Sequence, residues 1–447
     1  MLIKKAVGSY WGPHPKALKW AIQGIIIPSL SFGAIVWSKV CEHDDIMKRL
    51  TRLNRFMALS LMPVRKSTPT MALEVILGLK PLDIRIEEIA LKAFLRVLHK
   101  DSIKWGGVFK KDKGHLMRGK KMLASLGINT CDYDVTNSLN LNKKYSIDLD
   151  SFKKGTPDKN PTLKCFTDGS KISNQSGFGF AITEGNWVMA QEDGKLSPNN
   201  TVFQAEIMAI LKCAKALEMF ESTRAVIYSD SQAALAALNS HKIKHKSVKD
   251  CADALNDISI TKHVTLKYIK AHVGYSGNEY ADFLAKKGTV NTENNVVVAP
   301  PISWAKQLIE SYSLRKWASR WESTTDCRQS KIWFSKNNKR VSNFFISLGR
   351  LELGMVTQFL TGHNRLNYHE FVIDQNKDPW CRFCQEDFES SWHFIADCPQ
   401  FWGKRREIFK VDFLDENPEW VPEQIIKFIR RINFNYLNER GENSPSQ

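Results

Sequence analysis

The sequence predicts an α/β domain with a mixed sheet in the middle of the chain, between two helical regions. Three short β-runs, "TLKCFTDGS", "SGFGFAITEG" and "NWVMAQEDG", follow one another with turn residues between them. Helical and strand patterns then alternate up to about residue 290. A meander of strands followed by this alternation indicates a mixed sheet with helices on its faces.

Residues 1–125 are predicted to be mostly helical. The apolar stretch at 17–37 is interrupted by Lys19, Gln23 and Pro28. It therefore falls short of the ~20 uninterrupted apolar residues of a membrane span. We interpret it as two buried helical pieces joined at Pro28.

A Thr-Pro pair at 68–69 marks the start of two more helices, which Gly78 and Pro81 separate. The second of them is expected over about 84–98. Residues 126–162 lack a clear period and contain "SFKKGTPDKNP", so we expect a linker there.

The middle domain is expected over residues 163–290. After the three β-runs come a helix at 200–220, the strand "RAVIYSD", helices near 231–239 and 246–257, the strand "HVTLKYIKA" and a last helix from about Gly277. Residues 300–435 are again predicted to be helical and are rich in Trp and Phe. The tail, 436–447, has the composition of a disordered segment.

The net charge of +17 is unevenly distributed. Residues 1–162 hold 28 Lys and Arg against 14 Asp and Glu, whereas the rest of the chain is near neutral. Such an excess indicates a polyanionic partner, for which nucleic acid is the leading candidate; a solvated surface is the alternative. The candidates for phosphate contacts are the lysines of segment 108–121: Lys110, Lys111, Lys113, Lys120 and Lys121.

Nine cysteines are scattered along a chain whose first residues lack the apolar core of a secretory signal peptide. We therefore expect an intracellular, reducing compartment and no membrane attachment. In such a compartment clustered cysteines indicate a metal site rather than disulfides.

One cysteine cluster has the spacing C-x2-C-x8-H-x4-C, formed by Cys381, Cys384, His393 and Cys398. Tetrahedral zinc takes sulfur and nitrogen ligands of this kind. We therefore predict one structural Zn²⁺ ion in the carboxyl-terminal domain. The alternative is that all four residues are ordinary members of a core rich in Trp and Phe.

Four acids of the middle domain stand where the sheet would bring them together. Asp168 and Asp230 end strands, Glu206 lies beside the apolar face of its helix, and Asp282 lies in the last helix. Any one of them could be an ordinary capping or hydrogen-bonded group, as Asp230 before its helix illustrates. Four carboxylates at one edge would repel one another unless divalent cations neutralised them, and Mg²⁺ prefers oxygen ligands.

The segments "TDGS", "QAEIMAI", "YSDSQAAL" and "KAHVGYSGNEYADFLAKKG" together resemble ribonuclease H of type 1, in the family's order. The resemblance implies a five-stranded sheet, with three antiparallel strands first, flanked by helices. It implies hydrolysis of the RNA strand of an RNA–DNA hybrid with two Mg²⁺ ions, for which Mn²⁺ can substitute. The implied catalytic residues are Asp168, Glu206, Asp230 and Asp282, which bind the ions, and His272, which assists product release or proton transfer.

Proteins distinguish RNA from DNA by the 2′-hydroxyl groups in the shallow minor groove of the duplex. The candidates for contacting them are Gly169, Ser170, Asn200 and Gln232. Some relatives carry an additional basic helix that binds the hybrid. Here "NSHKIKHKSVKD" supplies four lysines without such a helix, so we expect other parts of the chain to contribute affinity.

The flanking regions resemble the carboxyl-terminal part of the second-ORF polyprotein of non-LTR retrotransposons that carry ribonuclease H after their reverse transcriptase. Residues 11–37 and 68–94 resemble the thumb and connection of that polymerase, and "TQFLTGHNRLNYH" with the Cys/His cluster resembles the segment that closes such polyproteins. No Y-x-D-D-type palm motif occurs in the sequence. We therefore expect a fragment that does not polymerise DNA.

Two functional hypotheses follow. The first is an active, metal-dependent ribonuclease H whose flanks bind nucleic acid; the second is a catalytically idle nucleic-acid-binding remnant. The complete set of four acids favours the first. An exonuclease or integrase on a related fold would need a different order of acids.

Overall fold

The computed structural model describes residues 8, 11–99, 114–129, 133–148, 163–271, 273–334, 338–414 and 422–432. The predicted tail at 436–447 lies outside these residues. The chain forms two compact units, which are described separately. The sheet unit is Leu95–Leu308, and the helical unit combines Met1–Phe94 with Ile309–Gln447.

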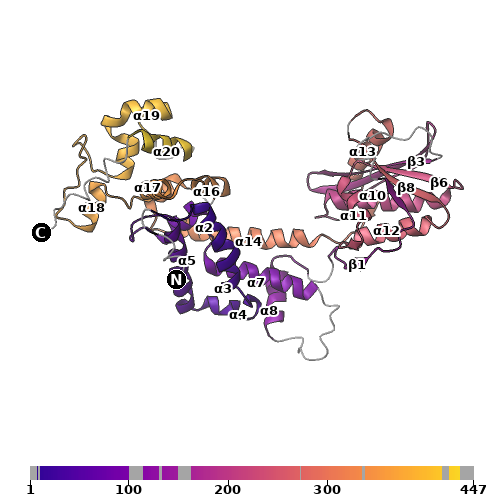
Figure 1. The fold of residues 1–447 in the computed structure, drawn as a ribbon, viewed down its shortest axis with the longest axis horizontal. Coiled ribbons are helices and arrows are strands. Elements are labelled where there is room, and N and C mark those ends of the chain that lie inside the picture. The colour runs from indigo at the N-terminus through magenta and orange to yellow at the C-terminus, as the bar shows by residue number, and fades with distance from the viewer. Residues whose placement is uncertain are drawn as a thin grey trace. The chain divides into compact units, whose positions relative to one another are not determined.

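The sheet unit is built around the five predicted strands. β3 (Leu163–Ile172), β4 (Gln175–Glu184) and β5 (Trp187–Leu196) form an antiparallel meander. β6 (Arg224–Ser229) and β8 (His263–Tyr268) continue the sheet in parallel on the other side of β3. The order β8-β6-β3-β4-β5 confirms the predicted mixed sheet. Figure 1 labels β3, β6 and β8 of this sheet.

Two short strands extend this sheet to seven, so the prediction of five was incomplete. β2 (Ser146–Asp148) pairs in parallel with β8, and β9 (Asn295–Val296) pairs in parallel with β5. β1 (Ser138–Leu139) forms a separate ribbon with β7 (Lys242–Ile243). β1 and β2 belong to the segment expected to be a linker. Strands of two or three residues show no periodicity from which a sequence could predict them.

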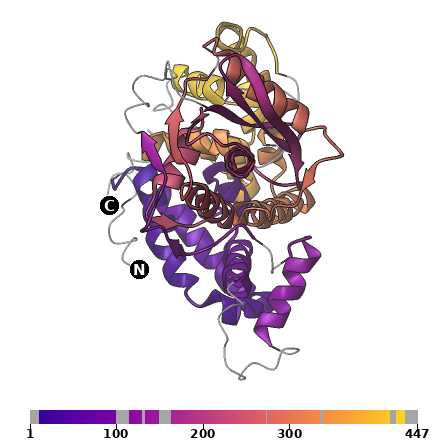
Figure 2. The same cartoon turned by 90° about the vertical axis from the view of Figure 1, so that its right-hand side faces the viewer.

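Helices pack on both faces of the sheet. Figure 2 turns the view of Figure 1 by 90°, so that the sheet unit faces the viewer. The helices are α10 (Val202–Ala216), α11 (Gln232–Asn239), α12 (Lys246–Ile258) and α13 (Ser276–Gly288). Cys165 of β3 is buried in one apolar cluster with residues of α10, α11 and α12. Its neighbour Phe166 is buried in a second cluster with Ala281 of α13. Because successive strand residues face opposite ways, α13 covers the opposite face from the other three.

The amino-terminal part of the helical unit differs from the prediction at 17–37. The chain stays helical through Pro28, because the π-helical turn η1 (Ile22–Ile26) runs directly into α3 (Ile27–Leu30). The break comes at Ser31–Gly33, where Gly33 has a φ of +66°. Phe32 at this break is 87 % exposed and Trp20 is 70 % exposed. The stretch is therefore only partly buried.

The other helical segments of this part are α2 (Pro15–Ala21), η1 (Ile22–Ile26), α4 (Ala34–Trp37), η2 (Ser38–Glu42), α5 (Asp44–Leu61), α6 (Thr70–Leu77) and α7 (Leu82–His99). Within the described ranges, no single helix combines the length and apolar composition needed to cross a membrane. The bent pair Pro15–Leu30 and Ala34–Glu42 meets that test only when its two members are taken together.

The carboxyl-terminal part of the helical unit packs with the amino-terminal part, where two separate helical domains were expected. Its helices are α14 (Ile302–Ser323), α15 (Arg328–Trp333), α16 (Lys339–Ile346), α17 (Arg350–Thr361), α18 (Asn367–Ile373), α19 (Trp402–Phe409) and α20 (Pro422–Arg431). Glu88 of α7 is 1 % exposed and accepts a hydrogen bond from Ser313 of α14 at 3.2 Å. Asp83 forms a two-pronged ion pair with Arg320 at 2.6 and 2.9 Å.

Candidate functional site

Two of the predicted acids lie on adjacent parallel strands. Asp168 is inside β3 and is 6 % exposed, and Asp230 directly follows β6. The register pairs Thr167 with Ser229, so the next residue on each strand is one of the two acids. The Thr167 hydroxyl donates to the Tyr228 carbonyl at 3.1 Å and ties the strands together beside them.

Asp230 is not the cap of the helix that follows it. The N-cap of α11 is Ser231, whose hydroxyl oxygen accepts from the Ala234 N–H at 3.3 Å. The Ser231 N–H in turn donates to the Ser229 hydroxyl oxygen at 3.2 Å. Ser229 and Ser231 therefore accept the hydrogen bonds at the start of this helix. Capping does not account for the carboxylate of Asp230, which lies between them in sequence.

Glu206 approaches the two aspartates from α10. A Cβ on Gly169, the neighbour of Asp168, would lie 2.5 Å from the Glu206 backbone nitrogen. The lack of a side chain at Gly169 therefore lets β3 and α10 come into close contact. Carboxylate oxygens of Asp168, Glu206 and Asp230 all lie within 4.8 Å of one another. We call these three residues the acidic cluster.

Asp282 stands beside the acidic cluster and is not one of its three members. It lies on α13, which rests closely on the sheet: a Cβ on Gly277 would lie 2.3 Å from the Phe166 ring. The Asp282 carboxylate pairs with Lys286 at 2.6 Å. It also acts on the pKa of Asp168 through its charge and a hydrogen bond. All four predicted acids therefore meet at one end of the sheet.

Burial and repulsion raise the pKa of two of these acids. Burial first, and then the charges of Asp230 and Asp282, raise the pKa of Asp168 to about 7. Burial, with the charges of Asp168 and Asp230, raises the pKa of Glu206 well above its ordinary value. Glu206 Oε2 is buried and has no hydrogen-bond partner among the described residues. A divalent cation with oxygen ligands would satisfy this atom and neutralise the charges, so these residues fit such an ion.

The predicted substrate contacts differ in accessibility. Gln232 is exposed in the first turn of α11, Ser170 is half-buried on β3, and Gly169 is buried. Asn200 is only 1 % exposed. Its side-chain nitrogen donates to Gln204 Oε1 at 3.1 Å and to the Ala299 carbonyl at 3.3 Å. The structure thus holds the Asn200 side chain inside the unit.

Two of the five candidate phosphate-binding lysines are described. Lys120 and Lys121 are exposed on α8 (His115–Ser125). Lys110, Lys111, Lys113 and the loop histidine His272 lie outside the described residues.

The predicted zinc ligands converge within the helical unit. Sγ of Cys381 lies 3.9 Å from Sγ of Cys398, and Sγ of Cys384 lies 3.3 Å from Nε2 of His393. All four ligand atoms lie within 4.8 Å of one another. Bonds of about 2.3 Å to sulfur and about 2.0 Å to nitrogen, arranged tetrahedrally, require ligand atoms roughly 3.5–3.8 Å apart. The residues therefore fit one zinc ion.

Surrounding contacts orient this Cys/His cluster. The Nδ1 atom of His393, on the side away from Cys384, lies 3.5 Å from the Asp387 carboxylate. Arg382, next to Cys381, forms an ion pair at 2.6 Å with the fully buried Glu389. Outer contacts of this kind fix the direction of metal-binding side chains.

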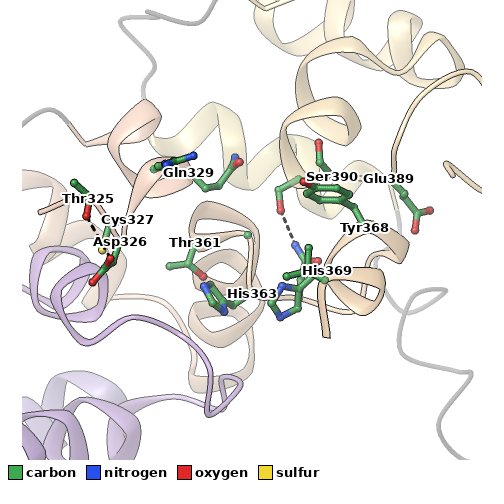
Figure 3. A pocket seen from close by; sticks show the side chains of 15 residues that line it. Thr325, Asp326, Cys327, Gln329, Thr361, His363, Tyr368, His369, Glu389 and Ser390 are labelled. Carbon is green, nitrogen blue, oxygen red and sulfur yellow. Dashed lines mark hydrogen bonds between the residues drawn. The ribbon is translucent and has the colours of Figure 1, made fainter. Parts of the chain in front are cut away.

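A pocket of about 370 Å³ lies in the helical unit and is lined by part of the "TQFLTGHNRLNYH" segment. Figure 3 shows His363 and His369 side by side in its wall, with ring centroids 4.8 Å apart. His363 also contacts the Ser67 hydroxyl at 3.0 Å through Nδ1. Burial, helped by the charges of His369 and Arg65, lowers the pKa of His363 to about 4. The two histidines belong to neither metal-type cluster found among the described residues.

A mixed sheet of this order, with carboxylates gathered at one end, defines the class of ribonuclease H-like proteins. Residues 160–290 match the family model described as RNase H. These residues form a ribonuclease H domain, as the motifs predicted.

Two relatives match parts of the chain. A ribonuclease H from Ralstonia nicotianae is 28 % identical over 137 residues, which cover 28 % of this chain and 88 % of that protein. A putative 115 kDa protein in the type-1 retrotransposable element R1DM of Drosophila melanogaster is 33 % identical over 86 residues. That match covers 19 % of this chain but only 8 % of the retrotransposon protein.

Solved structures also match part of the chain. RNase H1 from the halophilic archaeon Halobacterium salinarum has a TM-score of 0.24 at 18 % identity, covering 28 % of this chain and 96 % of that one. The N-terminal RNase H domain of a Mycobacterium tuberculosis protein, fused to maltose-binding protein, has a TM-score of 0.26 at 17 % identity. It covers 29 % of this chain and 94 % of that one.

Proposed function

We propose that this protein is a metal-dependent endonuclease that hydrolyses the RNA strand of RNA–DNA hybrids. The observation that carries the proposal is the acidic cluster, with Asp282 beside it, on a ribonuclease H domain. Buried carboxylates this close together repel one another, which is unfavourable unless cations bind between them. Mg²⁺ suits these oxygen ligands and also binds substrate phosphate oxygens.

Mg²⁺ ions bound here would supply the activation of water and the stabilisation of the leaving oxygen in an in-line displacement at phosphorus. The chain's own residues set the geometry. Paired strands fix Asp168 and Asp230, and the close contact at Gly169 fixes Glu206. The Asp282 side chain is 22 % exposed, more than Asp168 or Glu206. We place it on the side from which a phosphate group approaches.

For substrate recognition we propose direct roles for Gln232 and Ser170, which reach the surface next to the acidic cluster. Their polar groups suit the 2′-hydroxyls of the RNA strand. Gly169 and Asn200 are buried, so their proposed contribution is to shape the backbone around the site. His272 keeps its proposed accessory role in product release or proton transfer.

The helical unit is proposed to bind one structural Zn²⁺ ion through the Cys/His cluster. All four protein ligands are present, so a tetrahedral ion would have no open position for a substrate. The similarity to the R1DM protein over 86 residues supports the further proposal that the chain derives from a retrotransposon protein.

The deciding experiment is incubation of the purified full chain with labelled RNA–DNA hybrid, with Mg²⁺ and with a chelator. We expect cleavage of the RNA strand only with Mg²⁺, and no cleavage of double-stranded DNA or RNA. Binding of the hybrid without cleavage at any Mg²⁺ or Mn²⁺ concentration would instead favour the idle nucleic-acid-binding remnant.

A further inference from the structure

The segment before the ribonuclease H domain is locked to it through Asp134. This residue is 2 % exposed and precedes the residues that match the family. Its Oδ1 accepts from the Ser247 N–H at 2.7 Å. Its Oδ2 accepts from the Ser247 hydroxyl at 2.8 Å and from Gln204 Nε2 at 3.0 Å. A buried carboxylate that accepts hydrogen bonds from three donors is held firmly in place.

Gln204 connects Asp134 to the acidic cluster. It occupies the third position of α10 and forms a capping box with Thr201, whose N–H donates to Gln204 Oε1 at 3.1 Å. Glu206 follows two residues later on the same helix. The position of the first turn of α10 therefore determines where the Glu206 carboxylate lies.

A second segment outside the family match, around Ala299, is hydrogen-bonded to the same end of α10. The Ala299 carbonyl accepts from Gln204 Nε2 at 2.9 Å. The neighbouring Pro300 carbonyl accepts from the Asp134 N–H at 3.0 Å. Gln204 Nε2 thus donates one hydrogen bond to each of two segments, one before and one after the matched domain in sequence.

We propose that Asp134 is a positioning residue for Glu206, acting through Gln204. The catalytic unit then includes the segments around Asp134 and Ala299 as well as residues 160–290. This inference rests on the proposed function, because it takes Glu206 as a metal ligand. Both segments lie outside residues 160–290, which match the family model.

The variant Asp134→Asn tests this link with little change in shape. Its amide oxygen can still accept from the Ser247 N–H, and its amide nitrogen can donate to the Ser247 hydroxyl oxygen. That nitrogen then faces Gln204 Nε2, so two donors oppose each other where a hydrogen bond stood. The substitution therefore breaks the contact to Gln204, and it also removes the negative charge that faces His245 Nδ1, 3.6 Å from Oδ2.

Tyr145→Phe is the matched control. Tyr145 lies in the same segment and is buried, and its hydroxyl donates to the Leu238 carbonyl at 2.9 Å. Leu238 lies near the end of α11, so this bond does not involve α10. Both variants should unfold a few degrees below the wild type, since Asp134→Asn loses the bond from Gln204 and Tyr145→Phe loses the bonds to Leu238 and from Asn140.

Mg²⁺ binding to the full chain without substrate, measured by calorimetry, separates the two variants. We expect about a tenfold loss of Mg²⁺ affinity for Asp134→Asn, the lower end of the loss seen when a residue that orients a metal ligand is changed. Tyr145→Phe should keep the wild-type affinity. Wild-type affinity in Asp134→Asn, or an equal loss in Tyr145→Phe, overturns the inference, as does a wild-type chain that binds no Mg²⁺. A wild-type chain that binds Mg²⁺ but cleaves no hybrid overturns the proposed function alone.

Discussion

Asp168 shows how the chemistry of one carboxyl group depends on residues far from it in sequence. Its strand buries it, while Asp230 and Asp282 add negative charge from two other elements. The four acids could be predicted because each stands in a short motif at the end of a strand or on a helix facing the sheet. The burial that raises their pKa values could not be predicted, because it comes from packing across the whole sheet.

The first prediction concerns Asp168→Asn. We expect hybrid cleavage to fall by at least roughly a hundredfold, the scale seen when one preorganised electrostatic group is lost. In buffer without divalent ions the variant should unfold at a higher temperature, because one of three mutually repelling carboxylates is gone. Asp253→Asn, at an exposed position on α12, is the control. Undiminished cleavage by Asp168→Asn would remove this residue from the site.

A second prediction at this scale concerns Glu74 of α6, which is 4 % exposed and accepts from Asn54 Nδ2 at 2.5 Å. Burial raises the pKa of Glu74 to about 7, although the Asn54 hydrogen bond opposes this. The preference of the native state for protonated Glu74 contributes fully to stability below the ordinary pKa of 4.5. The contribution is lost as the pH rises through 7, because the native state resists losing the proton.

Glu74→Gln removes this titration and keeps an acceptor for Asn54. The variant should therefore be more stable than the wild type at pH 8, by on the order of 3 kcal/mol, with a smaller gain at pH 6. Thermal unfolding of the full chain at several pH values measures this. Glu88→Gln is a control of opposite sign: burial raises the pKa of Glu88, but hydrogen bonds from Lys80 and Lys92, together with the charges of Arg85 and Lys80, lower it to about 2. A Glu74→Gln variant with wild-type pH dependence contradicts the prediction.

Residues with buried polar roles were the hardest to recognise. Asn200 was predicted to contact substrate, yet its side chain is held by Ala299, almost one hundred residues further along the chain. Asp134 was not singled out, since it lies in a stretch without periodicity. Long-range hydrogen bonds of this kind leave no local pattern in a sequence.

At the scale of elements, long segments with strong periodicity were predicted well. The helix expected at 246–257 is α12 at Lys246–Ile258, and the strand "RAVIYSD" is β6 at Arg224–Ser229. The break in the amino-terminal apolar stretch was predicted at Pro28, but the chain stays helical through that residue and turns at Gly33. The short strands β2 and β9 depend on the sheet edges that they join.

The Cys/His cluster carries the third prediction. Elemental analysis of the full chain should find about one zinc per chain, and removing it with a chelator should lower the unfolding temperature of the helical unit. Cys398→Ser should lose the zinc. Cys327→Ser, at another buried cysteine of the same unit, should keep it. Equal zinc content in the two variants, or none in the wild type, would rule the site out.

At the scale of the whole molecule, the excess positive charge and the acidic cluster lie in different stretches of the chain. The net positive charge lies mainly in residues 1–162, whereas the acidic cluster lies beyond them. We propose that the basic stretch supplies much of the affinity for the hybrid. Each phosphate contact releases counterions, so the logarithm of the affinity should fall with the logarithm of salt by about 0.9 per contact, taking B-DNA as a guide.

The fourth prediction tests this division with Lys120→Ala and Lys121→Ala, made together in the Asp168→Asn background, in which we expect little cleavage during the binding measurement. Hybrid binding should weaken and its salt slope should become shallower by up to about 1.8, for two lost phosphate contacts. Lys215→Ala, at an exposed lysine of α10, should leave the slope unchanged. An unchanged slope in the double variant would make these lysines part of a solvated surface.

The helical unit is assembled from two stretches separated by more than two hundred residues. During synthesis Met1–Phe94 leaves the ribosome long before Ile309–Gln447 exists. At about 5–20 residues per second the wait is roughly 10–40 s. Until then Glu88 and Asp83 lack Ser313 and Arg320, their partners on α14. The sheet unit is continuous in sequence and can fold in the meantime, so the nascent chain passes through a stage in which only its sheet unit is complete.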